Sequence, residues 1–183
     1  ATLPYAKALT LTTQQGDLAN FTRYQPTPPV NVADRDYYKT LMADPDMESY
    51  LSAPVENRGS GTWTIYLARK FSSRDGEALG LILGAMRLDY FARFYSTINV
   101  GKGGAISLFR ADGTLLVRHP SVSGTIGTRT EPTARGQAMA LAAAQPGAPT
   151  AAPLVSPIDG EQRLTAIRAL DRYPVTVAVS TTL

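Results

Sequence analysis

Five acidic residues crowd a short stretch in the first half of the chain, where carboxylates could serve a hydrolase or bind a metal ion. They are Asp34, Asp36, Asp44, Asp46 and Glu48. A calcium loop needs oxygen ligands at alternating positions and a glycine at its sharp turn. The stretch matches no such loop, so solvated helix ends explain these carboxylates better than catalysis or metal binding.

Other groups that could do chemistry are scarce. The 183 residues include no cysteine and a single histidine, His119, which precedes Pro120 at the end of an expected strand. Without cysteine there is no disulfide, thiolate zinc site or cysteine nucleophile, and His119 has no evident helpers for a triad or a metal site. We therefore expect no enzyme activity, no catalytic residue, no metal and no cofactor.

The charge pattern argues against a nucleic-acid partner. Residues 1–98 carry ten basic and ten acidic side chains, and residues 99–183 carry eight and five, so the net charge of +3 arises in the second half. No basic cluster with interleaved aromatic residues is present. A weak basic bias would suit a surface near anionic lipid, although ordinary solvated charge explains it more simply.

Two stretches of the chain align without a gap at an offset of 97 residues, 8–23 with 105–120. Both alternate apolar and polar residues around a glycine, Gly16 or Gly113, which is typical of a β-hairpin with a tight turn. A second pair, 61–71 and 160–170, follows at an offset of 99. The pattern indicates one module used twice, with chance similarity of two hairpins as the alternative.

The remaining segments complete each module. The first half is expected to hold a helix over 35–42 capped by Asp34 and strands over 55–58, 62–71 and 79–88; the second half, a helix over 133–145 and strands over 164–170 and 175–179. A helix over 90–98, capped by Asp89, would join them. We predict an α+β fold of two tandem modules, each an antiparallel sheet of about five strands with flanking helices.

Several short motifs add to this pattern: residues 30–38, 54–55, 61, 76, 80–83, 112–113, 118–120, 156–160 and 173–174. In combination they resemble the double Cache domain, the tandem PAS-like extracytoplasmic sensor of bacterial diguanylate cyclases, histidine kinases and chemoreceptors. The long helix that precedes the first strand in such sensors has no counterpart here. We expect that it was removed, together with any membrane segment before it, to leave a soluble piece.

The resemblance implies two PAS-like modules with different tasks. A membrane-distal module, residues 1–88, would hold the ligand, residues 89–98 would connect the modules, and a membrane-proximal module, residues 99–183, would relay the change. The implied function is that of a periplasmic sensor domain of a membrane-anchored signalling protein. Its expected partners are a small-molecule ligand and, in the full-length protein, a second copy of the chain. The alternative is a ligand-free structural or dimerisation module.

The resemblance also implies ligand-binding residues. Relatives that bind amino acids carry Arg-x-Trp-Tyr on the distal helix, which residues 35–38 match with tyrosine in place of tryptophan. A guanidinium is a fixed fork suited to a carboxylate, and a surface ion pair with Asp34 or Asp36 is the alternative for Arg35. The candidate set is Arg35, Tyr37, Tyr38, Tyr50, Asn57, Tyr66 and Arg69.

Two departures from those relatives argue against an amino acid as the ligand. The relatives place Tyr-x-Asp after the proline and an acid in the last strand, which hold the ammonium group; the corresponding positions here are Val55, Asn57 and Ala85. The missing acids favour a ligand that is only an anion, such as a small carboxylate, or a more apolar solute. Arg69 and Arg87 could add positive charge to the cavity or point outward.

Overall fold

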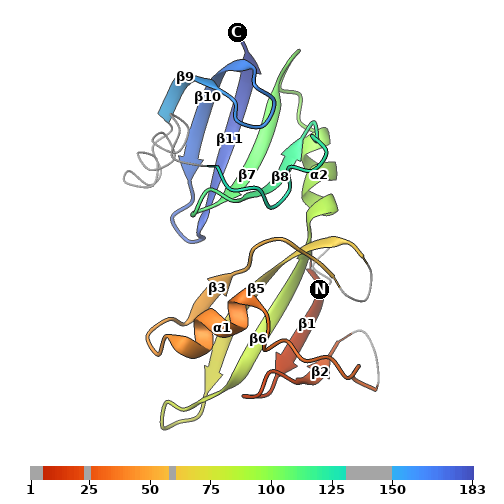
Figure 1. Ribbon diagram of the computed structural model, residues 1–183, viewed down its shortest axis with the longest axis vertical. Coiled ribbons are helices and arrows are strands. Elements are labelled where there is room, and N and C mark those ends of the chain that lie inside the picture. The colour runs from red at the N-terminus through yellow and green to blue at the C-terminus, as the bar shows by residue number, and fades with distance from the viewer. Residues whose placement is uncertain (1–5, 23–25, 58–60, 131–149) are drawn as a thin grey trace. The chain divides into compact units, whose positions relative to one another are not determined.

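The computed structural model of the chain describes residues 6–22, 26–57, 61–130 and 150–183. The chain forms two compact units, Ala1–Arg87 and Leu88–Leu183, which we call unit 1 and unit 2 (Figure 1). Each unit is built on one antiparallel sheet, as the sequence predicts. The helix expected over 133–145 lies outside the described residues. Within the described part of the chain, no helix is long and apolar enough to cross a bilayer.

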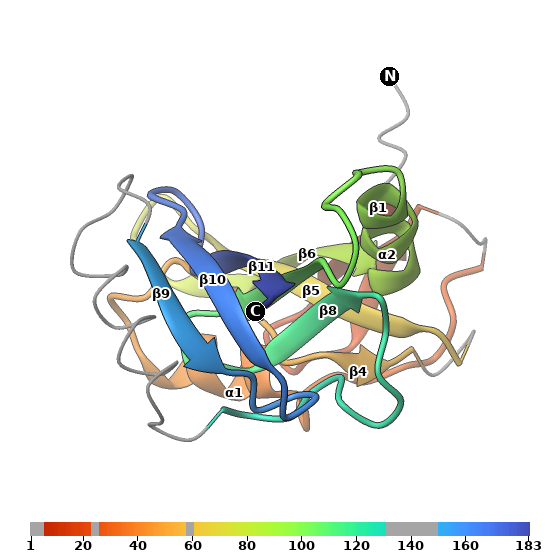
Figure 2. The same ribbon diagram turned by 90° about the horizontal axis from the view of Figure 1, so that it is seen from above.

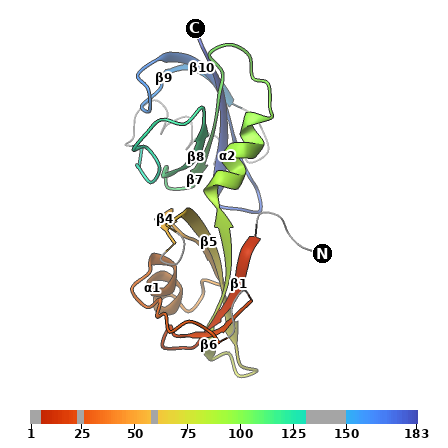
Figure 3. The same ribbon diagram turned by 90° about the vertical axis from the view of Figure 1, so that its right-hand side faces the viewer.

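Unit 1 is a six-stranded sheet with a helix on one face (Figure 3). Its elements are β1 (Ala6–Thr12), β2 (Leu18–Phe21), α1 (Asp36–Ala43), β3 (Ser49–Leu51), β4 (Val55–Glu56), β5 (Trp63–Ser72) and β6 (Ala78–Arg87). The strand order is β2-β1-β6-β5-β3, and β4 also pairs with β5. The central strands β5 and β6 therefore form the floor on which the helix lies.

Unit 2 repeats the plan with five strands. Its elements are α2 (Leu88–Ser96), β7 (Ala105–Arg110), β8 (Leu115–His119), β9 (Thr150–Val155), β10 (Gln162–Ala169) and β11 (Val175–Thr182). The strand order is β8-β7-β11-β10-β9, and Figure 2 shows β10 between β9 and β11. Its core brings Phe109, Leu115, Ile167 and Ala178 together on the inner face of this sheet.

The two sheets share one topology, which supports the predicted internal repeat. Each begins with a hairpin, β1–β2 or β7–β8. The first strand of the hairpin also pairs with the last strand of its unit, β6 or β11. Both hairpins close on a glycine of positive φ, Gly16 at 86° and Gly113 at 87°. Both also change register at the same aligned step, between Leu11 and Thr12 in β1 and between Leu108 and Phe109 in β7. Because the β5–β6 hairpin has the same kind of turn, with Gly76 at a φ of 85° and a register shift between Phe71 and Ser72, the support for the repeat comes from the shared strand order.

The structure departs from the predicted elements at β3, β9 and the starts of both described helices. The helix expected over 90–98 begins at Leu88, so Asp89 lies in its first turn and is not its cap. β3 is only three residues long, and β9 contains Pro153, which an edge strand tolerates because its outer side has no ladder to support. Neither segment carries a strand-like pattern. Arg35, rather than Asp34, is the N-cap of α1.

The core of unit 1 forms where α1 lies on the sheet. Tyr37 and Leu41 of the helix are buried against Ala68 of β5 and against Leu81 and Leu83 of β6. Successive strand residues point to opposite faces, so the even-numbered residues of β5 and the odd-numbered residues of β6 face the helix. This parity decides which side chains of these strands lie beside α1.

Lys70 holds the other end of the helix to the same face. Its side chain is buried, and its Nζ donates hydrogen bonds to the carbonyl oxygens of Asp44 and Pro45. Asp44 is the C-cap of α1, where the last carbonyl groups lack partners within the helix and a cation is favourable. Lys70 is therefore a structural cation of the sheet, and its sequence context did not predict this role.

Replacing Lys70 by methionine should destabilise unit 1. The Lys70→Met change keeps an unbranched side chain but leaves two carbonyl groups without their donor, which costs about 1–3 kcal/mol. Urea unfolding followed by the fluorescence of Trp63, the single tryptophan of the chain, reports unit 1 selectively. Arg69→Met is the matched control, because the exposed Arg69 is the adjacent residue on the opposite face; it should stay within about 0.5 kcal/mol of the parent. Equal midpoints for both variants would refute the role of Lys70.

Candidate functional site

Arg35 lies at the N-terminus of α1, where a helix favours negative charge. It is the N-cap residue, with extended backbone angles (φ −76°, ψ 149°), and its side chain makes no capping hydrogen bond. The side chain is half-buried. The positive charge of Arg35 lowers the pKa of the Tyr37 phenol, although burial and the neighbouring Tyr66 raise that pKa by more. A guanidinium and a helix N-terminus thus supply positive potential at one place.

Tyr37 and Tyr66 form an aromatic pair beneath this helix end. Tyr37 is only 1% exposed, and the two ring centroids lie 5.3 Å apart at a tilt of 37°. Burial, followed by the neighbouring Tyr66 and Asp36, raises the pKa of Tyr37 well above its ordinary range. The Tyr37 phenol therefore remains a neutral hydroxyl at physiological pH.

Asn57 and Arg87 join Tyr66 at this end of the sheet. The Nδ2 atom of Asn57 donates a hydrogen bond of 2.9 Å to the phenol oxygen of Tyr66. Tyr66 is directly opposite Ala85 across β5 and β6, and Arg87 is opposite Thr64. Directly opposed residues share a face, so Arg87 lies on the face that carries Tyr66.

Arg69 does not belong to this group. It alternates with Ala68 and Lys70, which face α1, and it is exposed on the other side of the sheet. Arg69, one of the predicted site residues, therefore lies away from the face that carries Tyr66, whereas Arg87 lies on that face together with the other odd-numbered residues of β6.

Tyr38 and Tyr50 have roles in packing. The Tyr38 hydroxyl donates a hydrogen bond to the carbonyl oxygen of Gln14 in the first hairpin, and burial together with Asp17 raises its pKa. Tyr50 of β3 is opposite Ala68 and packs against the core of unit 1. Tyr38 thus supports the helix from the hairpin, while Tyr50 lies on the face that carries Tyr66.

The acidic stretch forms helix ends, as its spacing suggested. The Asp36 Oδ1 and Oδ2 atoms accept hydrogen bonds from the backbone N–H groups of Tyr37 (2.8 Å) and Ala53 (2.7 Å). Asp44 Oδ1 accepts from the N–H groups of Asp46 and Met47. Among the described residues, no three histidine, aspartate or glutamate side chains converge as metal ligands would.

Sequence reasoning missed two charged groups, Lys70 and a cluster in unit 2 formed by Arg118, Asp159 and Arg163. The sequence around these residues does not show which side of the strand is buried, since Arg118 ends an apolar run and Lys70 directly follows Arg69. The signal that could have revealed them is whether each residue falls on the buried or the exposed face of its strand, because a cation on the buried face must have a partner. That face is known only once the strand's neighbours are known.

Solved structures of extracytoplasmic sensor domains share this fold. The extracellular domain of the putative histidine kinase rpHK1S-Z16 superposes with a TM-score of 0.82 at 28% identity, over 99% of this chain and 72% of that one. The ligand-binding domain of the Pseudomonas fluorescens chemoreceptor CtaA, in complex with L-isoleucine, gives 0.65 at 19% identity over 97% and 69%. That of the Pseudomonas aeruginosa PAO1 chemoreceptor PctB, in complex with L-Gln, gives 0.66 at 15% over 97% and 69%.

A family model settles the assignment. The dCache_1-like model, described as a histidine kinase sensor domain, matches residues 88–180, whereas no curated protein matches the chain. Domains of this family lie outside the cytoplasm, so the predicted fold, resemblance and extracytoplasmic location are confirmed. The match spans half of the sequence, and the chain belongs to the double Cache family of histidine kinase sensor domains.

Proposed function

We propose that unit 1 binds a small carboxylate, or another small organic anion, beside the N-terminus of α1. The observation that carries the proposal is the position of Arg35 at this helix end, next to the aromatic pair of Tyr37 and Tyr66. A guanidinium can bind a carboxylate through two parallel hydrogen bonds. Such a charge-assisted interaction contributes about 1.5–3 kcal/mol. Unit 1 would be the membrane-distal module of its parent, and unit 2 the proximal one.

The aromatic pair would form the apolar wall of the site. Tyr66 accepts a hydrogen bond from Asn57 at its phenol oxygen, which leaves its own hydroxyl hydrogen for another acceptor. The Tyr37 phenol stays neutral, because burial raises its pKa. Arg87 on the same face of the sheet adds a second positive charge. A ligand with one anionic end and a compact body suits these surroundings.

The residues around Tyr66 argue against an α-amino acid. Chemoreceptors of like fold have been solved with L-isoleucine and L-Gln. In this chain Ala85 occupies the position opposite Tyr66 and is buried, and it has no carboxylate to offer an ammonium group. The oxygens of Asp36 already accept the N–H groups of Tyr37 and Ala53. Arg35 and Arg87 would repel an ammonium group, and the carboxylate oxygens of Asp36 are already engaged by these N–H groups.

A signal would leave the site along β6. This strand carries Ala85 and Arg87 and runs directly into α2, which begins at Leu88. A ligand that prefers one position of β6 would shift the population of that position. Since the change passes along the chain itself, sensing of this kind needs no catalytic step.

The exposed outer face of the unit 1 sheet supports a second candidate function, an interaction module. Leu9 and Leu11 of β1 and Ile82 of β6 are between 37% and 53% exposed. Apolar residues grouped on one face often mark a contact surface. This function becomes the better one if unit 1 binds no solute.

Removing the Arg35 guanidinium should weaken ligand binding at this site. In a thermal-shift screen of small mono- and dicarboxylates, monitored by Trp63 fluorescence, we expect at least one to raise the unfolding temperature of unit 1. Arg35→Ala should weaken that ligand by roughly tenfold or more, because the lost charge-assisted pair contributes about 1.5–3 kcal/mol.

Arg69→Ala is the matched control for Arg35→Ala, since it removes the same charge from the opposite face. It should leave the affinity unchanged. Undiminished binding by Arg35→Ala would reject the site, and binding of L-amino acids in preference to their deaminated analogues would reject the ligand class.

The buried phenol of Tyr37 also predicts a pH dependence. Burial raises its pKa above the ordinary value of 10.0, so the unfolded chain loses this proton at lower pH than the folded one. The contribution of the protonated Tyr37 phenol to the free energy of unfolding is therefore fully present below about pH 10, and it is lost as the pH rises beyond that value. Tyr37→Phe should flatten the fall in the free energy of unfolding of unit 1 between pH 9 and 11, roughly the range around the ordinary tyrosine pKa. A slope identical to that of the parent would contradict the burial of this group.

A further inference from the structure

The protein makes no use of the hydroxyl group of Tyr37. The residue is almost fully buried, its backbone N–H donates to Asp36 Oδ1, and its ring lies against that of Tyr66. The Tyr37 hydroxyl itself makes no hydrogen bond with any residue in the described part of the chain. A hydroxyl in such a position without a partner is unfavourable and needs an explanation.

The Tyr37 hydroxyl nevertheless reaches accessible space. Among the described residues, the buried side-chain nitrogen or oxygen that has neither a partner nor contact with solvent is Arg118 Nε of unit 2. The Tyr37 hydroxyl also has no partner, so it must supply the remaining 1% of exposure of this residue. A group of the size of a single oxygen atom can therefore contact it from outside the core.

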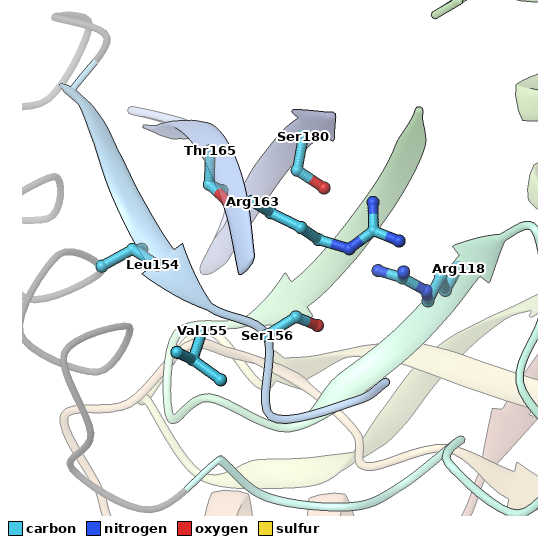
Figure 4. A pocket seen from close by; sticks show the side chains of 7 residues that line it. All are labelled: Arg118, Leu154, Val155, Ser156, Arg163, Thr165 and Ser180. Carbon is cyan, nitrogen blue, oxygen red and sulfur yellow. The ribbon is translucent and has the colours of Figure 1, made fainter. Parts of the chain in front are cut away.

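The charged cluster of unit 2 presents the opposite situation (Figure 4). The guanidinium groups of Arg118 and Arg163 point toward each other, and both bind Asp159. Arg118 also donates to Ser107 Oγ, and Arg163 to the carbonyl oxygen of Gly103. These donors are used inside the protein, and Arg118 Nε lies beneath the surface. This cluster therefore joins β8 to β10, and the donors in unit 1 are the ones a solute can reach.

Tyr66 supplies a second hydroxyl beside that of Tyr37. The two ring centroids are 5.3 Å apart, and Tyr66 is half-buried. The oxygen of Tyr66 accepts a hydrogen bond of 2.9 Å from Asn57 Nδ2. Its own hydroxyl hydrogen has no acceptor among the described residues. Two neighbouring phenols thus each have a hydrogen to donate.

Arg35 completes this set of donors. In the described part of the chain its half-buried side chain makes neither a capping hydrogen bond nor an ion pair. Among the groups that are charged at neutral pH, Arg35 has the largest effect on the pKa of the Tyr37 phenol, ahead of Asp36 and Asp34. The guanidinium is therefore a close electrostatic neighbour of that phenol.

The acceptors that the described residues provide here are already occupied. The two carboxylate oxygens of Asp36 accept the N–H groups of Tyr37 and Ala53. Ser52 Oγ accepts the N–H group of Tyr66 at 2.8 Å and donates to the carbonyl oxygen of Ala53 at 2.7 Å. A ligand at this site must therefore bring acceptors of its own.

A carboxylate with a carbonyl group on the adjacent carbon matches these donors. The guanidinium takes the two carboxylate oxygens through parallel hydrogen bonds, and a carbonyl oxygen has two lone pairs, one for each phenol. A hydroxyl or ammonium group on the same carbon would turn hydrogens toward Arg35 and toward the phenol hydrogens. A second carboxylate would be costly to desolvate against the buried Tyr37.

We propose that the unit 1 site selects 2-oxo acids, whose carbonyl oxygen accepts hydrogen bonds from the hydroxyls of Tyr37 and Tyr66. The inference rests on the proposed function, since it takes Arg35 as the anchor of the carboxylate. It adds a role for the two phenols, which distinguish the ligand from other small carboxylates. The remainder of the ligand chain lies along the tyrosine rings.

The experiment is isothermal titration calorimetry of the whole chain with acids that differ only at the second carbon. The three-carbon probes are propionate, lactate, alanine and pyruvate, and the four-carbon probes are butyrate, 2-hydroxybutyrate and 2-oxobutyrate. We expect the 2-oxo acid of a set to bind roughly tenfold more tightly than the unsubstituted acid, because it makes two additional hydrogen bonds to a neutral acceptor.

Two variants test the assigned donors. Tyr37→Phe keeps the ring and removes the hydroxyl, so the preference for the 2-oxo acid should fall by about threefold or more, while the affinity for the unsubstituted acid stays the same. The double variant Tyr37→Phe/Tyr66→Phe should lose the preference altogether. Tyr38→Phe is the matched control on the same helix, because its hydroxyl is bonded to Gln14; it should keep the full preference.

The results separate this inference from the proposed function. Equal affinity for 2-oxo and unsubstituted acids, with both weakened by Arg35→Ala, would overturn the selection of 2-oxo acids and leave the carboxylate site standing. Tighter binding of the 2-hydroxy acid would also overturn it, as would a preference that Tyr37→Phe leaves intact in a folded protein. Failure of every acid to bind at millimolar concentration would reject the carboxylate site together with its selectivity.

Discussion

An eight-residue helix is too short to be stable in water by itself, so α1 persists only through its contacts with the sheet of unit 1. Three contacts hold it. Asp36 ties its first turn to the backbone of Ala53, Lys70 ties its last turn to the sheet, and Tyr37 with Leu41 fills the core between them. Arg35 is positioned because both ends of this helix are held.

The repeat explains how one chain came to have two different inner faces. Both units have the same strand order, turn glycine and bulge, so the backbone plan tolerates different side chains on the inner face of the sheet. In unit 1 that face carries the tyrosine pair beside Arg35. In unit 2 it has an apolar end around Phe109 and a polar end around Asp159.

The inner face of each sheet contains buried cations, and each of them needs partners. A buried cation is tolerated only with hydrogen-bonded partners, and the two units meet this requirement differently. Lys70 donates to two carbonyl groups at a helix end. Arg163 and Arg118 share one carboxylate. Lys70 thus holds a helix end in place, whereas Asp159 joins two strands of unit 2, β8 and β10.

Local patterns predicted the hairpins, the long central strands and the two described helices, because a tight-turn glycine and an apolar period depend on neighbouring residues alone. They also indicated Arg35 and the tyrosines through a motif on one helix. β3 and β9 escaped prediction since each is held by a single neighbouring strand rather than by its own sequence.

The sequence by itself thus determined two tandem sheets and the helix that carries Arg35. Only the tertiary structure decided which strand arginine shares a face with Tyr66, since a single-residue shift in register exchanges the faces of a strand. It alone brought Arg118 to Asp159, 41 residues away in the chain, because antiparallel pairing aligns strands that are distant in sequence. Contacts of this kind depend on register and burial, neither of which a local pattern contains.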